Sequence, residues 1–165
     1  MSEIADRVAR IREQMAHAAA QAGRDEKEIL LLAATKMNDA QRVREAIAAG
    51  VDICGENRVQ ELQEKNAQGA YEGCPLHFIG HLQKNKAKFL VGTVELIHSV
   101  DSPELMTTIN RLAAQRGLTQ DILIEVNVGG EIAKSGIPPE AADEMAAKME
   151  EICDILRKCM SFMLT

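Results

Sequence analysis

The amino-acid sequence predicts an α/β fold, a parallel (β/α) barrel of which about five of eight units and a preceding helix are present. Three observations lead there. Five short apolar runs alternate with segments of helical spacing, and strands separated by helices of ten or more residues pair in parallel. The five units fill residues 31–151, about 24 residues each, which suits one eighth of a closed barrel. An open doubly wound sheet is the structural alternative, but its usual GxGxxG and Walker A glycines are missing.

The elements follow in a regular order. A first helix is predicted over residues 2–22, from the helical spacing of Ile4, Val8, Ile11 and Met15. The apolar runs predict strands over residues 28–35, 51–55, 76–80, 94–100 and 121–128. The intervening segments predict helices over 39–49, 58–68, 82–91, 103–116 and 138–151. Gly50 and Gly117 stand where helices end, and the sequence DSPE at 101–104 is a helix start with proline just inside it.

Composition bounds the function. With 165 residues, 46% hydrophobic and 27% charged, residues 1–165 are expected to form one domain. A net charge of -6 and 2% aromatic residues argue against a nucleic-acid partner. No apolar run approaches the roughly 20 residues of a membrane span, and the charged N-terminus is unlike a secretory signal. The four cysteines form no CxxC pair. We therefore expect reduced thiols and a cytoplasmic protein.

Polar side chains stand at or just beyond the carboxyl end of every predicted strand, where parallel α/β folds gather their functional residues. They are Lys36, Glu56, Asn57, His81, Ser99, Asp101 and Asn127. A purely structural explanation is available for any one of them, since a strand that leaves the core must end in a polar residue. Lys36 is a stronger functional candidate, because it directly follows the longest apolar run and the aliphatic part of its side chain is expected to begin in a low dielectric. Desolvation favours the neutral, nucleophilic amine, which indicates a Schiff base with a carbonyl substrate or with pyridoxal phosphate.

Other candidates are weaker. His77 and His81 share a face of a predicted strand but lie about 13 Å apart by strand rise, too far for one zinc ion, so no metal site is predicted. Lys84, Lys86 and Lys88 are expected to form a solvated helix face rather than a phosphate or RNA patch.

Four stretches in the same order carry a family resemblance. They are TKMNDAQRVREAIAAGVDICGENRVQELQEK, LHFIGHLQKNKAKFL, IHSVDS and ILIEVNVGGEIAKSGI. From about residue 5 to about residue 152 the chain resembles the pyridoxal phosphate homeostasis proteins, which have the barrel domain of alanine racemase without its second domain. The resemblance implies that Lys36 holds pyridoxal 5'-phosphate as an internal aldimine. It also implies that the protein buffers or delivers the cofactor, with no established catalytic reaction.

The resemblance extends to further residues and partners. It places Lys134 at a second family lysine. Asn57, which ends the second predicted strand, and His81, which follows the third, are also predicted to bind the cofactor. We expect the Asn57 amide to hydrogen-bond near Lys36 or the cofactor ring; the alternative is an Asx turn that starts the next helix. PLP-dependent apo-enzymes are the implied recipients, and intact relatives are expected to be monomeric.

Two alternatives stay open. One is a PLP-dependent racemase-like enzyme, which needs a second acid–base group; the single tyrosine, Tyr71, is expected on the amino-terminal side of the barrel. The other is a non-functional remnant, because residues 154–165 form a divergent tail without the family's sixth strand or its phosphate-binding loops. A truncated barrel is expected to expose two edge strands, 28–35 and 121–128, and to self-associate.

Overall fold

The structure is a computed structural model that describes residues 2–131, 133–152 and 162–164. The chain divides into two compact units. The first unit comprises Met1–Glu56 and Gln60–Leu76, and the second comprises Asn57–Val59 and His77–Thr165. Among the helices of the described ranges, none combines the length and the apolarity that crossing a membrane requires.

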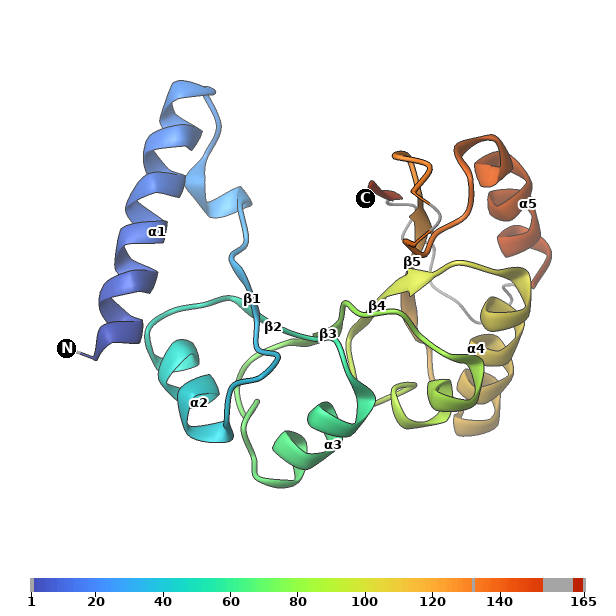
Figure 1. The fold of residues 1–165 in the computed structure, drawn as a ribbon, viewed down its shortest axis with the longest axis horizontal. Helices are drawn as coiled ribbons and strands as arrows, with labels where there is room; N and C mark the ends of the chain where they lie inside the picture. The colour runs from blue at the N-terminus through green and yellow to red at the C-terminus, as the bar shows by residue number, and fades with distance from the viewer. Residues whose placement is uncertain (1, 132, 153–161, 165) are drawn as a thin grey trace. The chain divides into compact units, whose positions relative to one another are not determined.

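The first unit begins with the predicted N-terminal helix. Its elements are α1 (Glu3–Gln21), the 3-10 helix η1 (Glu26–Glu28), β1 (Leu32–Ala34), α2 (Ala40–Ala48), β2 (Ile53–Glu56) and most of α3 (Val59–Ala67). Strands β1 and β2 pair in parallel, and α1 packs against α2 (Figure 1). Ser2 caps α1 by accepting a hydrogen bond from the Ala5 N–H. These elements confirm the predicted alternation of helices and strands.

The first strand is shorter than predicted. The sequence indicated extended chain over 28–35, but residues Glu26–Glu28 form η1 and only Leu32–Ala34 pair as β1. The Asp25 carboxylate accepts a hydrogen bond from the Lys27 N–H at 3.0 Å. That side-chain bond favours a turn over extended chain where the predicted strand was to start.

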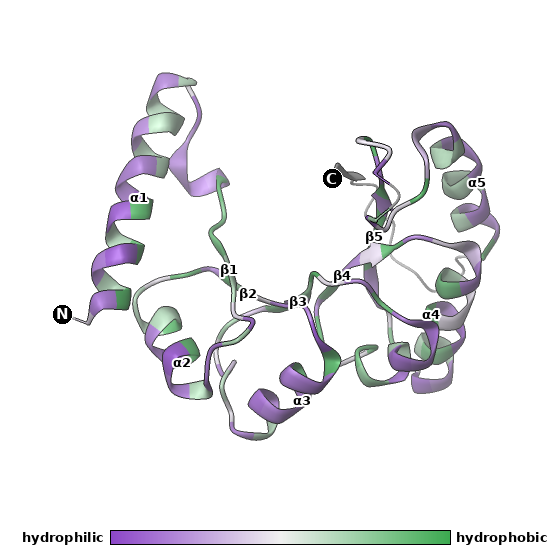
Figure 2. Cartoon of the chain, in the orientation of Figure 1, coloured by the Kyte–Doolittle hydropathy of each residue, from purple (hydrophilic) through white to green (hydrophobic). Residues whose placement is uncertain are grey.

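The second unit continues the parallel order. Its elements are the last two residues of β3 (Leu76–Phe78), η2 (Lys84–Phe89), β4 (Leu96–Val100), α4 (Pro103–Arg116), β5 (Asp121–Val126), η3 (Pro139–Ala141), α5 (Ala142–Ile152) and β6 (Phe162–Leu164). Parallel pairing runs β3, β4, β5, β6. Helix α4 packs against α5 and η2 (Figure 1), and in Figure 2 hydrophobic and hydrophilic residues alternate along α4. The fully buried core residues include Phe78, Ile97, Met106, Ile109 and Ile122.

Two predictions for this unit are wrong. The segment 82–91 contains the 3-10 helix Lys84–Phe89 rather than an α-helix, and its N-cap residue Gln83 makes no side-chain capping bond. The sequence also predicted no sixth strand, yet Phe162–Leu164 pairs with β5. Three consecutive apolar residues suit a neighbour of a buried strand, so β5 is not the exposed edge that we expected. The rest of the divergent tail, 154–161 and Thr165, lies outside the described residues.

Candidate functional site

Lys36 lies in the first unit, two residues beyond the end of β1. Thr35 is buried with 5% exposure, whereas the Lys36 side chain is exposed. The position at the carboxyl end of the strand is as predicted. The expected low-dielectric setting is wrong, because the chain has already left the strand and the core at Lys36.

Both peptide groups of Lys36 are held by charged side chains of α3. The Lys65 ammonium donates to the Thr35 carbonyl at 2.8 Å, and the Met37 N–H donates to Glu61 Oε2 at 2.9 Å. Met37 has a φ of 60°, the only positive φ among the described non-glycine residues. An αL conformation is strained for an unbranched non-glycine residue and persists only where its surroundings impose it. The chain around Lys36 is thus a fixed turn.

A buried polar network lies directly behind this turn. Glu56, the last residue of β2, is fully buried, and its Oε1 accepts from Thr35 Oγ1 at 2.6 Å, Lys65 Nζ at 2.6 Å and Tyr71 OH at 3.0 Å. Burial first, and then the Glu56 charge, raise the pKa of Tyr71. The Tyr71 hydroxyl therefore reaches the carboxyl end of β2, contrary to the expectation that it would lie on the amino-terminal side.

Sequence reasoning missed this network. One signal was present: Lys65 lies three residues after Leu62, which is fully buried, so it falls on the buried face of α3. A lysine on the apolar stripe of a helix needs a buried partner, and Glu56 is that partner.

In the second unit, Asn57 and the residue before His81 are in close contact. A Cβ built on Gly80 would lie 2.2 Å from the Asn57 carbonyl oxygen, so only glycine permits this approach. Asn57 Oδ1 is buried and has no hydrogen-bond partner within the described ranges. That oxygen therefore does not make the Asx turn we considered. His81 Nδ1 lies 3.4 Å from Asp101 Oδ2, and the His81 side chain is 56% exposed.

The carboxyl ends of β4 and β5 carry more unpaired polar atoms. In the part of the chain that the structure describes, Ser99 Oγ, Glu125 Oε2 and Asn127 Oδ1 are buried without hydrogen-bond partners. Burial raises the pKa of Glu125, the Asp101 charge adds to this, and His81 opposes it. Such unsatisfied atoms are rare in native proteins and call for an explanation. A polar ligand at the ends of these strands would supply one.

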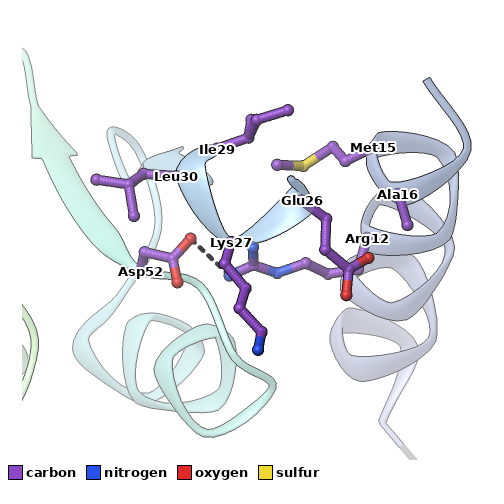
Figure 3. Close-up of a pocket in the computed structure, with 8 residues that line it drawn as sticks. All are labelled: Arg12, Met15, Ala16, Glu26, Lys27, Ile29, Leu30 and Asp52. Carbon is purple, nitrogen blue, oxygen red and sulfur yellow. Dashed lines mark ion pairs between the residues drawn. The ribbon is translucent and has the colours of Figure 1, made fainter. Parts of the chain in front are cut away.

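A hollow of about 430 Å³ lies elsewhere in the first unit, before β2 (Figure 3). Two of its charged groups are bonded to the protein itself: Arg12 Nη2 contacts Asp52 Oδ2 at 2.6 Å and the Gly50 carbonyl at 2.6 Å. Partial burial raises the pKa of Asp52, but the Leu31 N–H and Arg12 outweigh it and the net shift is downward. Leu30 and Asp52 of its lining precede β1 and β2, so the hollow lies at the amino-terminal ends of these strands and not at the carboxyl ends where parallel α/β folds gather functional residues. This hollow is therefore not the candidate site.

No metal centre emerges from the described side chains: no group of three or more His, Cys, Asp and Glu among them could hold an ion. What remains is a lysine on a fixed turn after β1 and unpaired polar atoms at the ends of later strands. The described fold is that of the parallel β-α proteins, a class whose functional residues gather at the carboxyl ends of the strands.

Comparison with known proteins specifies the family. The family model described as "Alanine racemase, N-terminal domain" matches residues 6–164. The chain belongs to this family, and within it to the pyridoxal phosphate homeostasis proteins. The predicted fold, a parallel α/β barrel of the alanine racemase type, is thereby confirmed.

Three relatives illustrate the match. A pyridoxal phosphate homeostasis protein of Aquifex aeolicus is 42% identical over 85% of this chain and 61% of its own length. The one from Vibrio cholerae is 32% identical over 98% of this chain and 70% of its own length. PipY of Synechococcus elongatus, solved with PLP bound, matches with a TM-score of 0.78 and 27% identity, over 98% of this chain and 70% of its own. The chain thus spans about three fifths to seven tenths of these relatives.

Proposed function

We propose that this protein binds pyridoxal 5'-phosphate through Lys36 and acts as a reservoir from which the cofactor is released, without a reaction of its own. The observation that carries the proposal is the exposed Lys36 amine on a turn whose two flanking peptide groups are fixed. The pyridoxal phosphate homeostasis proteins that this chain resembles and the PLP bound to PipY support the same cofactor.

The residues present fit the cofactor's chemistry. When bound, pyridoxal phosphate supplies an aldehyde that condenses reversibly with a primary amine. Lys36 offers that amine in the first unit. In the second unit, the unpaired Asn57 Oδ1 and Ser99 Oγ offer buried acceptors or donors for a polar ring edge, and the exposed His81 ring offers a face or an N–H.

One observation favours a second candidate, a racemase-like enzyme. Such an enzyme needs a second acid–base group, and Glu125 is a buried carboxyl with a raised pKa beside Asp101. Tyr71 does not fill this role, because its hydroxyl is buried and committed to Glu56. Incubating the loaded protein with amino acids in deuterated water separates the two proposals. Deuterium at the α-carbon, lost in Glu125→Gln, identifies the enzyme, and unlabelled amino acid identifies the reservoir.

The primary test is a titration with pyridoxal phosphate followed by absorbance. We expect the absorbance band of a lysine aldimine, which the spectrum of the free cofactor does not contain. The band should be absent in Lys36→Ala and retained in Lys84→Ala, a matched change at an exposed lysine of η2. Borohydride reduction followed by peptide mapping then locates the bond. Label mainly on Lys84, Lys86 or Lys134 would refute the assignment of Lys36.

The proposal also covers the cellular location of the protein and the recipients of the cofactor. We propose a cytoplasmic location, supported by the free thiols of Cys54 and Cys74, which persist in a reducing compartment. PLP-dependent apo-enzymes are the proposed recipients, because they consume the cofactor that a reservoir releases.

A further inference from the structure

Helix α3 holds Lys36 on both sides. Glu61 and Lys65 are four residues apart on this helix, so they share one face, and their charged groups lie 3.4 Å apart. Lys65 bonds the peptide group before Lys36, and Glu61 bonds the peptide group after it. No other residue of the first unit is held in this way by an ion pair on both of its peptide groups, among those whose contacts the structure describes.

The turn would not hold this shape by itself. Met37 is 87% exposed, so no packing of its side chain fixes its backbone. Its positive φ is unfavourable for a residue with a Cβ. The Glu61 carboxylate, itself 21% exposed, is the acceptor that fixes the Met37 N–H in this orientation.

From this geometry we infer that Glu61 and Lys65 are positioning residues for Lys36, which set the direction in which its amine meets the cofactor. The inference rests on the proposed function of Lys36. Lys65 is anchored in turn by the buried Glu56, so the Thr35 side of the turn is tied to the core. Glu61 is the more accessible member of the pair, and its variants test the inference with less damage to the core.

The test compares Glu61→Leu, which removes the acceptor, with Glu61→Gln, which keeps an oxygen for the Met37 N–H. The matched control is Glu64→Leu, the same change at an exposed position of the same helix. In the cofactor-free protein we measure hydrogen exchange of the Met37 amide. With added pyridoxal phosphate we measure its dissociation constant by absorbance and the rate of borohydride fixation at Lys36.

We expect Glu61→Leu to exchange the Met37 amide faster and to bind pyridoxal phosphate about tenfold more weakly or worse, as for loss of a hydrogen bond to a charged acceptor. Glu64→Leu should resemble the parent protein in all three measurements. Glu61→Gln keeps an acceptor for the Met37 N–H but loses the charge, so it should lie between the parent and Glu61→Leu. Unchanged affinity and fixation rate despite faster exchange would overturn the inference, as would unchanged exchange. A parent protein that takes no label at Lys36 would instead refute the proposed function, so the two failures are distinguishable.

A second pair of variants covers the case in which Glu61→Leu does not fold. Met37→Gly adopts a positive φ without strain and keeps its N–H, whereas Met37→Val disfavours that conformation. We expect retained affinity in Met37→Gly and about tenfold weaker binding in Met37→Val. Equal affinity in the two variants would overturn the inference without any change to α3.

Discussion

Replacing Lys65 by methionine would strand a buried charge. Lys65 is 6% exposed and gives two short hydrogen bonds, to Glu56 Oε1 at 2.6 Å and to the Thr35 carbonyl at 2.8 Å. Glu56 is fully buried. Breaking a buried ion pair by removing one partner costs about 3–5 kcal/mol. The Thr35 and Tyr71 hydroxyls still donate to Glu56, so we expect the lower end, about 3 kcal/mol.

The magnitude is tested against a variant that removes both charges. In Lys65→Met combined with Glu56→Gln, no charge is left in the core and the glutamine oxygen keeps the two hydroxyl donors. We expect a loss of about 1 kcal/mol there, which is about 2 kcal/mol smaller than the loss in Lys65→Met alone. Urea unfolding followed by circular dichroism measures all three proteins, with the exposed Lys84→Met as a control expected within about 0.5 kcal/mol of the parent.

The outcome that contradicts this reasoning is specific. If Lys65→Met is as stable as the parent, Glu56 is not an uncompensated charge when its partner is gone. If the double variant is less stable than Lys65→Met, removing the unpaired Glu56 charge does not restore stability. The argument that this buried, uncompensated charge is what destabilises Lys65→Met then fails.

Three further predictions follow from other parts of the structure. Gly80→Ala places a Cβ 2.2 Å from a backbone oxygen and should lower the unfolding free energy by about 2–3 kcal/mol. The control Gly129→Ala, whose Cβ would have one side-chain atom within 4 Å, should change the unfolding free energy by under about 0.5 kcal/mol. Equal effects of the two substitutions would refute the close contact at Gly80. Burial and a neighbouring histidine lower the pKa of His98 to about 4, so its contribution to stability is present above about pH 6.5 and is lost as the pH falls toward 4. Between pH 7 and pH 5 we expect the unfolding free energy to fall by about 1–2 kcal/mol, a loss that His98→Gln removes. An unchanged dependence of the unfolding free energy on pH in that variant would contradict the assignment. The Cys54 and Cys74 sulfurs lie 3.6 Å apart, so one molecule of hydrogen peroxide should oxidise the two thiols to one disulfide, with release of two waters. The reaction should begin at Cys74, because burial raises the pKa of Cys54 to about 12. Peptide mapping that shows oxidised Cys74 with Cys54 still free would refute this.

The sequence was sufficient where local chemistry decides the structure. Helix α4 starts at Pro103, with Ser102 as its cap, and is closed by Gly117 at a φ of 63°. The serine, proline and glycine each have a local reason to stand there. The place of Lys36 just beyond β1 was predicted for the same kind of reason, since the end of an apolar run is visible in the sequence.

The parts that sequence reasoning missed depend on contacts distant along the chain. The Glu56, Lys65 and Tyr71 side chains meet although 15 residues separate the first from the last. The helical pattern indicates that Lys65 needs a buried partner, but it does not indicate which residue that partner is. Strand β6 was missed because a three-residue apolar run carries no periodicity by itself. The exposure of Lys36 was mispredicted because the exact end of β1 depends on its pairing with β2.

The position of the buried ion pair is informative about function. A buried pair of charges is weak support for stability, because well-packed apolar residues often serve as well. Here the pair sits where it can do something that apolar residues cannot, since Lys65 donates to the Thr35 carbonyl beside Lys36. An exposed amine on a backbone fixed in this way suits a ligand that must be captured in one orientation and later returned to solvent. A buried amine would favour tight retention instead, so the combination of a rigid turn and an open side chain fits the proposed reservoir better than an enzyme that keeps its cofactor through many turnovers.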